Sequence, residues 1–482
     1  MSKTVCRRLL VLMLLAGAAR AHVGSPDVYY EGEAGPYHLL VTVRPPAMIP
    51  GVAEVEVQAT SGNVIRISIV PVYVTGKDQG YPPAPDVMQA VAGSPQTFTG
   101  KVWLMESGSW QVRATVDGAQ GTGNLAVPVA AFARRTLPMQ KTLGALLFGL
   151  MIFLSLGMVS IAWAAAREGS LEPGAAPESR NLRAGRIAFI VSTVLVVGIL
   201  FLGNSWWNSE ASTQKQDMLY KAPPLEASLK DGQHLVLQMK SSYWHERRKN
   251  AWSMKLIPDH GHLMHLFLLR VPAMDRFYHL HPDEVGDQTF ALNLPAMDAG
   301  HYKIFADVVR ETGFPDTMVS EIDLPQIAGQ PPSGDDSEVS ATAFSDRSTQ
   351  VWPLPDGGHM VWEQNSSPSA IGKLTWFRFK VEDKDGKPVS DLQPYMGMAG
   401  HAVFVRSDES VFAHIHPAGS VPMAALAVAQ NDSAMKHDMA TMMSLEVSFP
   451  YGFPRAGNYR LFVQVKRGEK IETGVFDTRV GP

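Results

Sequence analysis

Two pairs of histidines, each with one residue between its members, are the feature of this sequence most able to do chemistry. They occur as His279-Leu-His281-Pro and His414-Ile-His416-Pro. In a β-strand, residues two apart face the same side, so each pair would place two imidazoles about 6–7 Å apart. Two rings placed in this way can converge on one metal ion, and the proline fixes the path of the chain after the pair. The pattern therefore predicts two ligands at each place.

A third histidine precedes each pair at a matching position. His265 opens the run HLFLLR and His401 opens the run HAVFVR, which indicates that two domains are duplicates. A shared apolar core would not require polar rings to reappear at matching places, whereas a duplicated site would. Each set would supply three nitrogens to one ion, as His265, His279 and His281 in one domain and His401, His414 and His416 in the next.

The alternative is that these are solvated or hydrogen-bonded histidines at the ends of strands. On either interpretation we expect the rings to face the surface. Replacing a pair by alanine would then change stability by only ~0.5 kcal/mol. A pH below about 6 would release the ion, because protonated imidazole cannot ligate.

Methionines near the third domain's histidines favour copper as the ion. Met396 and Met398 lie just before His401, and thioether and imidazole without thiolate suit copper. A polar segment that we expect to be a loop carries further soft donors, either as a Cu(I)-capturing surface or incidentally: Met423, Met435, His437, Met439, Met442 and Met443. Zinc or nickel is the alternative at the second domain, where only nitrogen donors are expected. Its weaker candidates are His260, His262 and His301.

The amino terminus has the pattern of a secretory signal peptide. Basic residues precede an apolar run from Leu9 to Ala18, and Ala19-Arg20-Ala21 offers small residues before a cleavage site. The single cysteine, Cys6, lies within this leader, so thiolate chemistry is excluded from the mature chain. Cleavage would leave His22 first, where its amino group and ring could chelate Cu(II), although an export site can leave a histidine by chance.

Two further apolar segments are long enough to span a membrane. Leu143–Ala166 and Ile187–Trp207 each exceed or match the ~20 residues that cross ~30 Å of hydrocarbon, and tryptophans lie at their ends. The basic residues beside the first span are nearly balanced, so the leader decides the orientation. We expect insertion in the inner (cytoplasmic) membrane, with the 167–186 connection in the cytoplasm and the larger domains in the periplasm or extracellular space.

The exported parts are predicted to be mainly β. A glycine, any residue and an aromatic residue, followed by alternating apolar residues, recur at Gly108, Gly300 and Gly457, and this period of two indicates strands. Three immunoglobulin-like β-sandwiches plus two transmembrane helices fit this pattern. The resulting division is a signal peptide at 1–21, a first sandwich at 22–136, transmembrane helices at 143–166 and 187–207 joined by the loop at 167–186, a linker at 208–228, a second sandwich at 229–327, a linker at 328–342 and a third sandwich at 343–482.

Composition excludes one class of partner. Of 482 residues 18% are charged and the net charge is −4, so no basic field would attract nucleic acid. No Ser-His-Asp, Cys-His or phosphate-loop pattern is present, and we do not expect an enzyme. The expected function is a metal-binding accessory protein, such as a chaperone or buffer. The alternatives are an interaction module for a membrane complex and, less favoured, a redox metalloenzyme.

The chain resembles exported β-sandwich proteins of the YtkA-like and FixH-like kind and, more loosely, CopC-like copper-resistance domains. The resemblance rests on Gly35-Pro-Tyr37, Arg44-Pro-Pro46, the strand starts at Gly300 and Gly457, and the HLHP and HIHP tetrads. CopC-like proteins begin their mature chain with a copper-ligating histidine, a role that His22 would match, but their other ligands have no counterpart that we can place. The FixH-like resemblance implies an accessory role in assembling a respiratory complex in the envelope.

Overall fold

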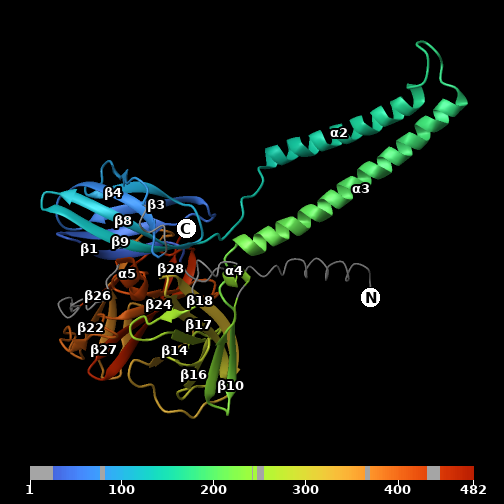
Figure 1. Ribbon diagram of the computed structural model, residues 1–482. Helices are drawn as coiled ribbons and strands as arrows, with labels where there is room; N and C mark the ends of the chain where they lie inside the picture. Colours follow the sequence, from blue (N-terminus) through green and yellow to red (C-terminus); the bar gives the residue numbers. More distant parts are fainter. Residues whose placement is uncertain (1–24, 76–81, 242, 247–253, 364–369, 431–445) are drawn as a thin grey trace. The chain divides into compact units, whose positions relative to one another are not determined.

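The computed structural model describes residues 25–75, 82–241, 243–246, 254–363, 370–430 and 446–482. The chain is mainly β, with six antiparallel sheets, and it divides into two compact units (Figure 1). One unit comprises Met1–Arg134 and Tyr220–Pro482, and the other comprises Arg135–Leu219. The sheets all belong to the first unit and the two long helices to the second.

The first β region contains two of the six sheets, in the orders β1-β2-β3-β7-β6 and β5-β4-β8-β9. Alternation of buried and exposed residues along β3 shows why these segments become strands with one face on a core. The strands are β1 (Val28–Ala34), β2 (Tyr37–Arg44), β3 (Gly51–Ala59), β4 (Val64–Tyr73), β5 (Asp86–Val87), β6 (Gln89–Ala90), β7 (Thr97–Leu104), β8 (Gly108–Gly118) and β9 (Gly121–Ala131).

The second β region pairs a sheet of order β10-β11-β16-β15 with one of order β12-β17-β13-β14-β19, in which β18 also pairs with β17. Its elements are β10 (Leu225–Lys230), β11 (His234–Met239), α4 (Tyr243–Glu246), β12 (Leu256–Ile257), β13 (His265–Arg270), β14 (Arg276–Leu280), β15 (Asp283–Gly286), β16 (Thr289–Asn293), β17 (Gly300–Arg310), β18 (Pro315–Leu324) and β19 (Ser337–Ser340).

The third β region repeats this plan with sheets of order β20-β21-β22-β26 and β23-β27-β24-β25, and β28 pairs with β27. Its elements are β20 (Val351–Pro353), β21 (His359–Glu363), β22 (Thr375–Glu382), β23 (Leu392–Gln393), β24 (His401–Arg406), β25 (Phe412–Ile415), α5 (Met423–Gln430), β26 (Glu446–Tyr451), β27 (Gly457–Arg467) and β28 (Lys470–Val480).

The three repeated motifs are strands, as the sequence predicts. Gly108, Gly300 and Gly457 begin β8, β17 and β27, which are 11 residues long in each case. Each β region has a pair of sheets, but all three regions lie within one compact unit. The division into three separate sandwich domains therefore stays a prediction.

The expected linker at 328–342 is partly wrong. Residues Ser337–Ser340 form β19, which pairs with β14 so that Ser337 lies opposite His279. The polar composition of this segment suits an edge strand, because a strand at the end of a sheet can leave one side to solvent. The segment thereby brings acidic residues next to the histidines.

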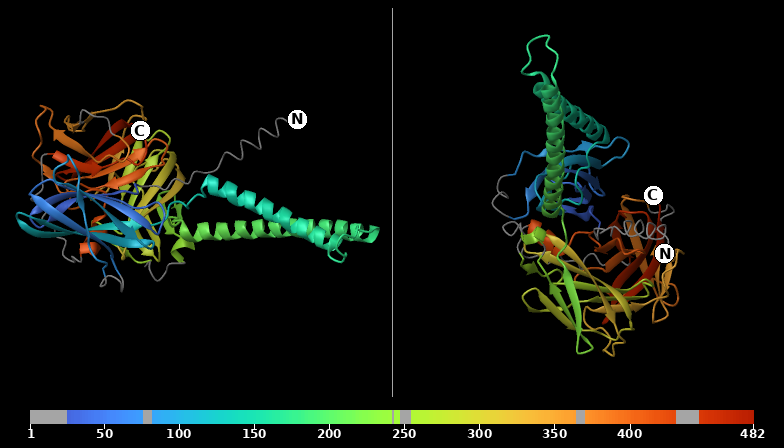
Figure 2. Two further views of the ribbon diagram at one scale, coloured as in Figure 1. Left: turned by 90° about the horizontal axis from the view of Figure 1, so that it is seen from above. Right: turned by 90° about the vertical axis from the view of Figure 1, so that its right-hand side faces the viewer.

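The two long helices are α2 (Lys141–Glu168) and α3 (Ser179–Met218), which run side by side in the second unit (Figure 2). Both are long and apolar enough to cross a membrane, judged by length and composition. Helix α3 is longer than expected at both ends, so parts of the predicted loop at 167–186 and linker at 208–228 are helical. Residues 208–218 contain neither glycine nor proline, which explains why the helix continues beyond its apolar part.

Candidate metal centre

The alternation of side chains along β13 and β14 points their histidines away from the core of their own sheet pair. Leu266 and Leu268 lie in the core of the second β region, whereas Phe267 and Leu269 lie in a separate apolar cluster shared with the third β region. His265 is on the same face as Phe267, because residues two apart share a face. The histidines therefore lie where the two β regions pack together.

The packing between the two β regions is nearly symmetric. Phe277 stacks on Phe462 with ring centroids 4.1 Å apart, and Phe412 stacks on Phe305 at 4.2 Å. In the sequence repeat, Phe277 corresponds to Phe412 and Phe305 to Phe462. The two stacked pairs are thus equivalent, each with one ring from the second β region and one from the third. The duplicated histidines face one another across this interface.

His265, His279 and His281 form what we call the first histidine group. Nδ1 of His265 lies 3.1 Å from Nε2 of His279 and 3.2 Å from Nε2 of His281. Three ligand atoms bound to one ion in tetrahedral geometry at 2.0–2.1 Å would lie about 3.3–3.4 Å apart. The group could hold an ion without a large rearrangement.

Hydrogen bonds on the outer side of these rings determine which nitrogens carry protons. Nε2 of His265 donates to the backbone carbonyl of Asp259 at 3.1 Å, and Nδ1 of His281 donates to Asp336 at 2.9 Å. Because a carbonyl and a carboxylate can only accept, the inner nitrogens of both neutral rings hold lone pairs. Nδ1 of His279 is similarly placed to donate to the amide oxygen of Gln464 at 2.9 Å. This is the outer arrangement usual for metal-bound histidines.

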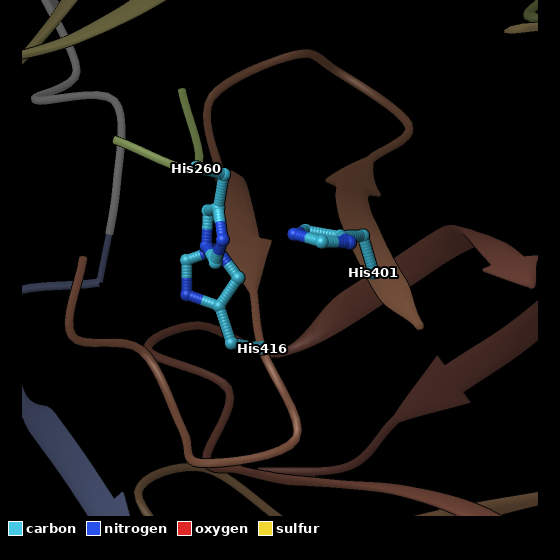
Figure 3. Close-up of side chains that lie close together, drawn as sticks. All are labelled: His260, His401 and His416. Atoms are coloured by element: carbon cyan, nitrogen blue, oxygen red, sulfur yellow. The ribbon is translucent and has the colours of Figure 1, made fainter. Parts of the chain in front are cut away.

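His260, His401 and His416 form the second histidine group, and their rings point toward one another (Figure 3). Nδ1 of His260 donates to the backbone carbonyl of Met396 at 2.8 Å, and Nδ1 of His416 donates to that of Val421 at 3.2 Å. Their Nε2 atoms, and both ring nitrogens of His401, are buried without a hydrogen-bond partner among the described residues. The Nε2 atoms of His260 and His416 and one ring nitrogen of His401 could ligate an ion, while the other nitrogen of the neutral His401 ring carries its proton.

A tight turn brings His260 into the second group. The segment Asp259-His260-Gly261-His262 closes with φ of 50° at His260 and 89° at Gly261, and the corresponding segment Tyr395-Met396-Gly397-Met398 has the same form. Positive φ at both central positions is typical of a type I′ turn, for which the glycine is favourable. The two turns are joined by the hydrogen bond from Nδ1 of His260 to the carbonyl of Met396.

His414 departs from the predicted set of His401, His414 and His416. Its Nδ1 lies 3.4 Å from a carboxylate oxygen of Asp307 on β17, and His260 from the second β region completes the group in its place. The His414 ring remains close, with its centroid 5.4 Å from that of His265 and 5.5 Å from that of His401. It thus lies between the two groups.

Burial holds the histidines in the neutral form. It lowers the pKa of His265, His279, His401 and His416 well below the usual 6.5, and neighbouring imidazoles lower it further. The pKa of His281 is also lowered, mainly by burial, although Asp336 opposes the shift. Neutral rings are the form that binds metal.

The expectation that the histidines face the surface is wrong. His279 and His401 are 0% exposed and His265 and His416 are 2% exposed, because a second sheet covers the outer face of each hairpin. Substitution at these positions therefore changes the packing between the two β regions and not only a surface.

The structure places most of the other candidate ligands outside the two histidine groups or does not describe them. Met396 contacts His260 through its backbone carbonyl, and Met398 pairs with Tyr395 through the backbone. His301 is exposed and paired with Asp323 at 2.8 Å, away from both groups. His262 stacks on His281 with centroids 3.9 Å apart. Met423 begins α5, which replaces the start of the expected loop. The remaining candidates lie outside the described residues: His22, Met435, His437, Met439, Met442 and Met443.

Sequence reasoning missed the groups that orient the rings. Asp336 accepts from both the backbone and the ring of His281 at 2.9 Å, and Asp259 supplies the carbonyl that fixes His265. The available signal was the composition of HLFLLR and HAVFVR, which are apolar on both faces. Strands of this kind are usually covered on both sides.

A cavity of about 170 Å³ adjoins the histidines. Its wall includes His265, His414 and His416, and it is also lined by residues of the first β region such as Val129 and Phe132. The lining is mostly apolar around this polar end. The cavity gives the buried groups a neighbouring space large enough for several atoms of a ligand.

Comparisons with known proteins add little to this geometry. Residues 355–481 match a domain family of unknown function, DUF8832, and no curated protein matches the chain. Among solved structures, an engineered protein is 20% identical over 20% of this chain and 21% of its own, with a TM-score of 0.16. Chicken CNTN1 FN1–FN3 domains are 7% identical over 91% of this chain and 97% of their own, with a TM-score of 0.14. Superpositions this poor support no conclusion about function.

Proposed function

We propose that this protein is a membrane-anchored metal-binding accessory protein that holds its ion among buried imidazoles outside the cytoplasm. No catalytic step is required for this role. The protein would act as a chaperone or buffer, with its sites kept at the membrane by the two apolar helices.

The pair formed by Nδ1 of His265 and Nε2 of His281 carries the proposal. The two atoms are 3.2 Å apart. In each neutral ring the single N–H lies on the opposite side and donates a hydrogen bond, to the carbonyl of Asp259 from His265 and to Asp336 from His281. Two lone pairs that face each other in a buried site repel unless a cation or a further proton lies between them. Burial disfavours the further proton, since it lowers the pKa of both rings. A metal ion satisfies all of these groups at once.

Copper is the ion that we favour, and zinc is the alternative. Imidazole suits both metals, and Cu²⁺ binds a given nitrogen site more tightly than Zn²⁺ in the usual order of affinities. The side chains that converge in the structure are histidines, which offer nitrogen ligands. Copper is therefore favoured over zinc mainly by its higher affinity for nitrogen, and less by the thioethers of Met396 and Met398.

The proposed location follows from the leader and the two helices. With residues 1–21 removed on export, α2 and α3 would cross the inner membrane and return, and the β regions would lie in the periplasm. The resemblance to FixH-like proteins supports a respiratory complex of the envelope as the recipient of the metal.

Metal analysis of the full chain, purified in detergent, tests the proposal. The protein is incubated with Cu(II) or Zn(II), separated from free ion and analysed for bound metal. His281→Gln should lose the ion of the first histidine group, because one of three ligands is gone. His301→Gln is the matched control, since His301 is an exposed histidine in the same β region.

The outcomes separate metal binding from the interaction-module alternative. We expect the control to bind as much metal as the unchanged protein, and His281→Gln to bind less. If the unchanged protein retains no more of either ion than a variant lacking His265, His279 and His281 together, the metal proposal is wrong and the interaction-module hypothesis replaces it.

A further inference from the structure

The second histidine group draws its ligands from both sides of the interface. His401 and His416 belong to the third β region, whereas His260 lies on a turn of the second. The sequence repeat alone would place His414 in this group. The contribution of His260 means that the group exists only when the two β regions are packed together.

Unpaired nitrogens distinguish this group from an ordinary cluster of core histidines. Nε2 of His260, Nε2 of His416 and both ring nitrogens of His401 are buried without hydrogen-bond partners in the part of the chain that the structure describes. A buried polar atom left unpaired costs about 1–3 kcal/mol, so several at one place are not expected without a ligand. Figure 3 shows that the three rings point toward one another.

The donor set identifies the chemical class of that ligand. Carbonyls of Met396 and Val421 accept hydrogen bonds from Nδ1 of His260 and His416, so the Nε2 atoms of these two rings hold lone pairs that can bind a cation. An anion would be repelled by such lone pairs. A divalent or monovalent transition-metal cation that binds imidazole nitrogen fits them.

We propose that a second metal ion binds to His260, His401 and His416, next to the ion of the first group, and that it fastens the second and third β regions to each other. This inference rests on the proposed function but concerns a separate ion. The two sites together form a two-ion centre inside the interface.

The short distances between the groups support a paired centre. The ring centroids of His260 and His265 are 6.1 Å apart, and those of His279 and His401 are 6.4 Å apart. His414 lies between the groups, with an unpaired Nε2 among the described residues, and could serve either ion. His414 and His416 also line the cavity beside the centre, which leaves room for an exchangeable ligand.

The number of ions bound by single variants tests this inference. The full chain in detergent is loaded with Zn(II), chosen because it has no redox chemistry, and the metal-to-protein ratio is measured after removal of free ion. We expect two ions for the unchanged protein and for the His301→Gln control. His260→Gln and His281→Gln should each bind one ion, and the double variant should bind none.

A second measurement isolates the fastening role of His260. Hydrogen exchange of β24 and β25 should slow when Zn(II) is added to His281→Gln, which keeps the second site, and should not change in His260→Gln. His260→Gln keeps a side chain that can still donate to the carbonyl of Met396, so loss of the fold is not expected.

The inference and the proposed function fail in different ways. No bound ion in the unchanged protein would overturn both. One bound ion that is lost in His281→Gln but kept in His260→Gln would leave the proposed function intact and overturn the second site. Two ions retained by His260→Gln would show that the second ion does not use the ligand from the second β region.

Discussion

Replacing His401 by leucine should make the metal-free protein more stable while it destroys the second site. His401 is 0% exposed, and neither of its ring nitrogens has a hydrogen-bond partner within the described structure. The penalty for an unpaired buried polar group is about 1–3 kcal/mol, and leucine of similar volume removes it. We therefore expect the free energy of unfolding without metal to rise by about 1–3 kcal/mol.

Thermal unfolding with and without metal measures both parts of this prediction. A gain of 1 kcal/mol raises the melting temperature of a domain of about 150–250 residues by about 2–4 °C. In the presence of a chelator, His401→Leu should melt at a higher temperature than the unchanged protein. After addition of Zn(II), the unchanged protein should gain more, because two sites and not one are filled.

The control for this experiment is His301→Leu. His301 is exposed and lies away from both groups, so its replacement should change stability by no more than ~0.5 kcal/mol with or without metal. A His401→Leu variant that is less stable than the unchanged protein in chelator would show that the nitrogens of His401 have partners in the metal-free protein, which would remove the basis for this prediction.

Three other perturbations give independent tests. The folded state depresses the pKa of the buried histidines below 6.5, so at lower pH the unfolded chain binds more protons than the folded one. The free energy of unfolding without metal should therefore fall as pH drops below about 6.5, by up to ~1.4 kcal/mol per pH unit for each ring. Urea unfolding at pH 5–8 would measure this loss. Stability that does not change between pH 7 and pH 5 would contradict these lowered pKa values. Asp336→Asn should weaken metal binding about 10–100-fold in calorimetric titrations, because Asp336 orients a ligand, and Asp323→Asn should not; equal effects would refute that role. A reporter fused after Met218 should be exported and one inserted at Glu172 cytoplasmic, and the reverse result would overturn the orientation.

The sequence was sufficient to predict the mainly β fold, because alternation and turns are local signals. The strands that begin at Gly108, Gly300 and Gly457 follow directly from a period of two. The convergence of His265, His279 and His281 also followed, since it depends on one hairpin and on side chains two residues apart.

The sequence could not predict which faces meet between the two β regions. The stacking of Phe277 on Phe462 depends on contacts between residues far apart in the chain, and no local pattern specifies them. For that reason the expected exposure of the histidines was wrong, and the contribution of His260 to the second group was not foreseen. Asp336 was missed for a related reason, because a polar stretch reads as a linker until its pairing with β14 is known.

X-ray absorption by the protein loaded with Zn(II) reports directly which atoms are bound to the ion and so tests whether the buried histidines hold it. We expect nitrogen ligands at about 2.0–2.1 Å with the outer-shell scattering of imidazole, reduced in amount when His260 or His281 is replaced. Sulfur at about 2.3 Å as the main ligand, or no retained zinc, would contradict the assignment of the buried histidines as a metal centre.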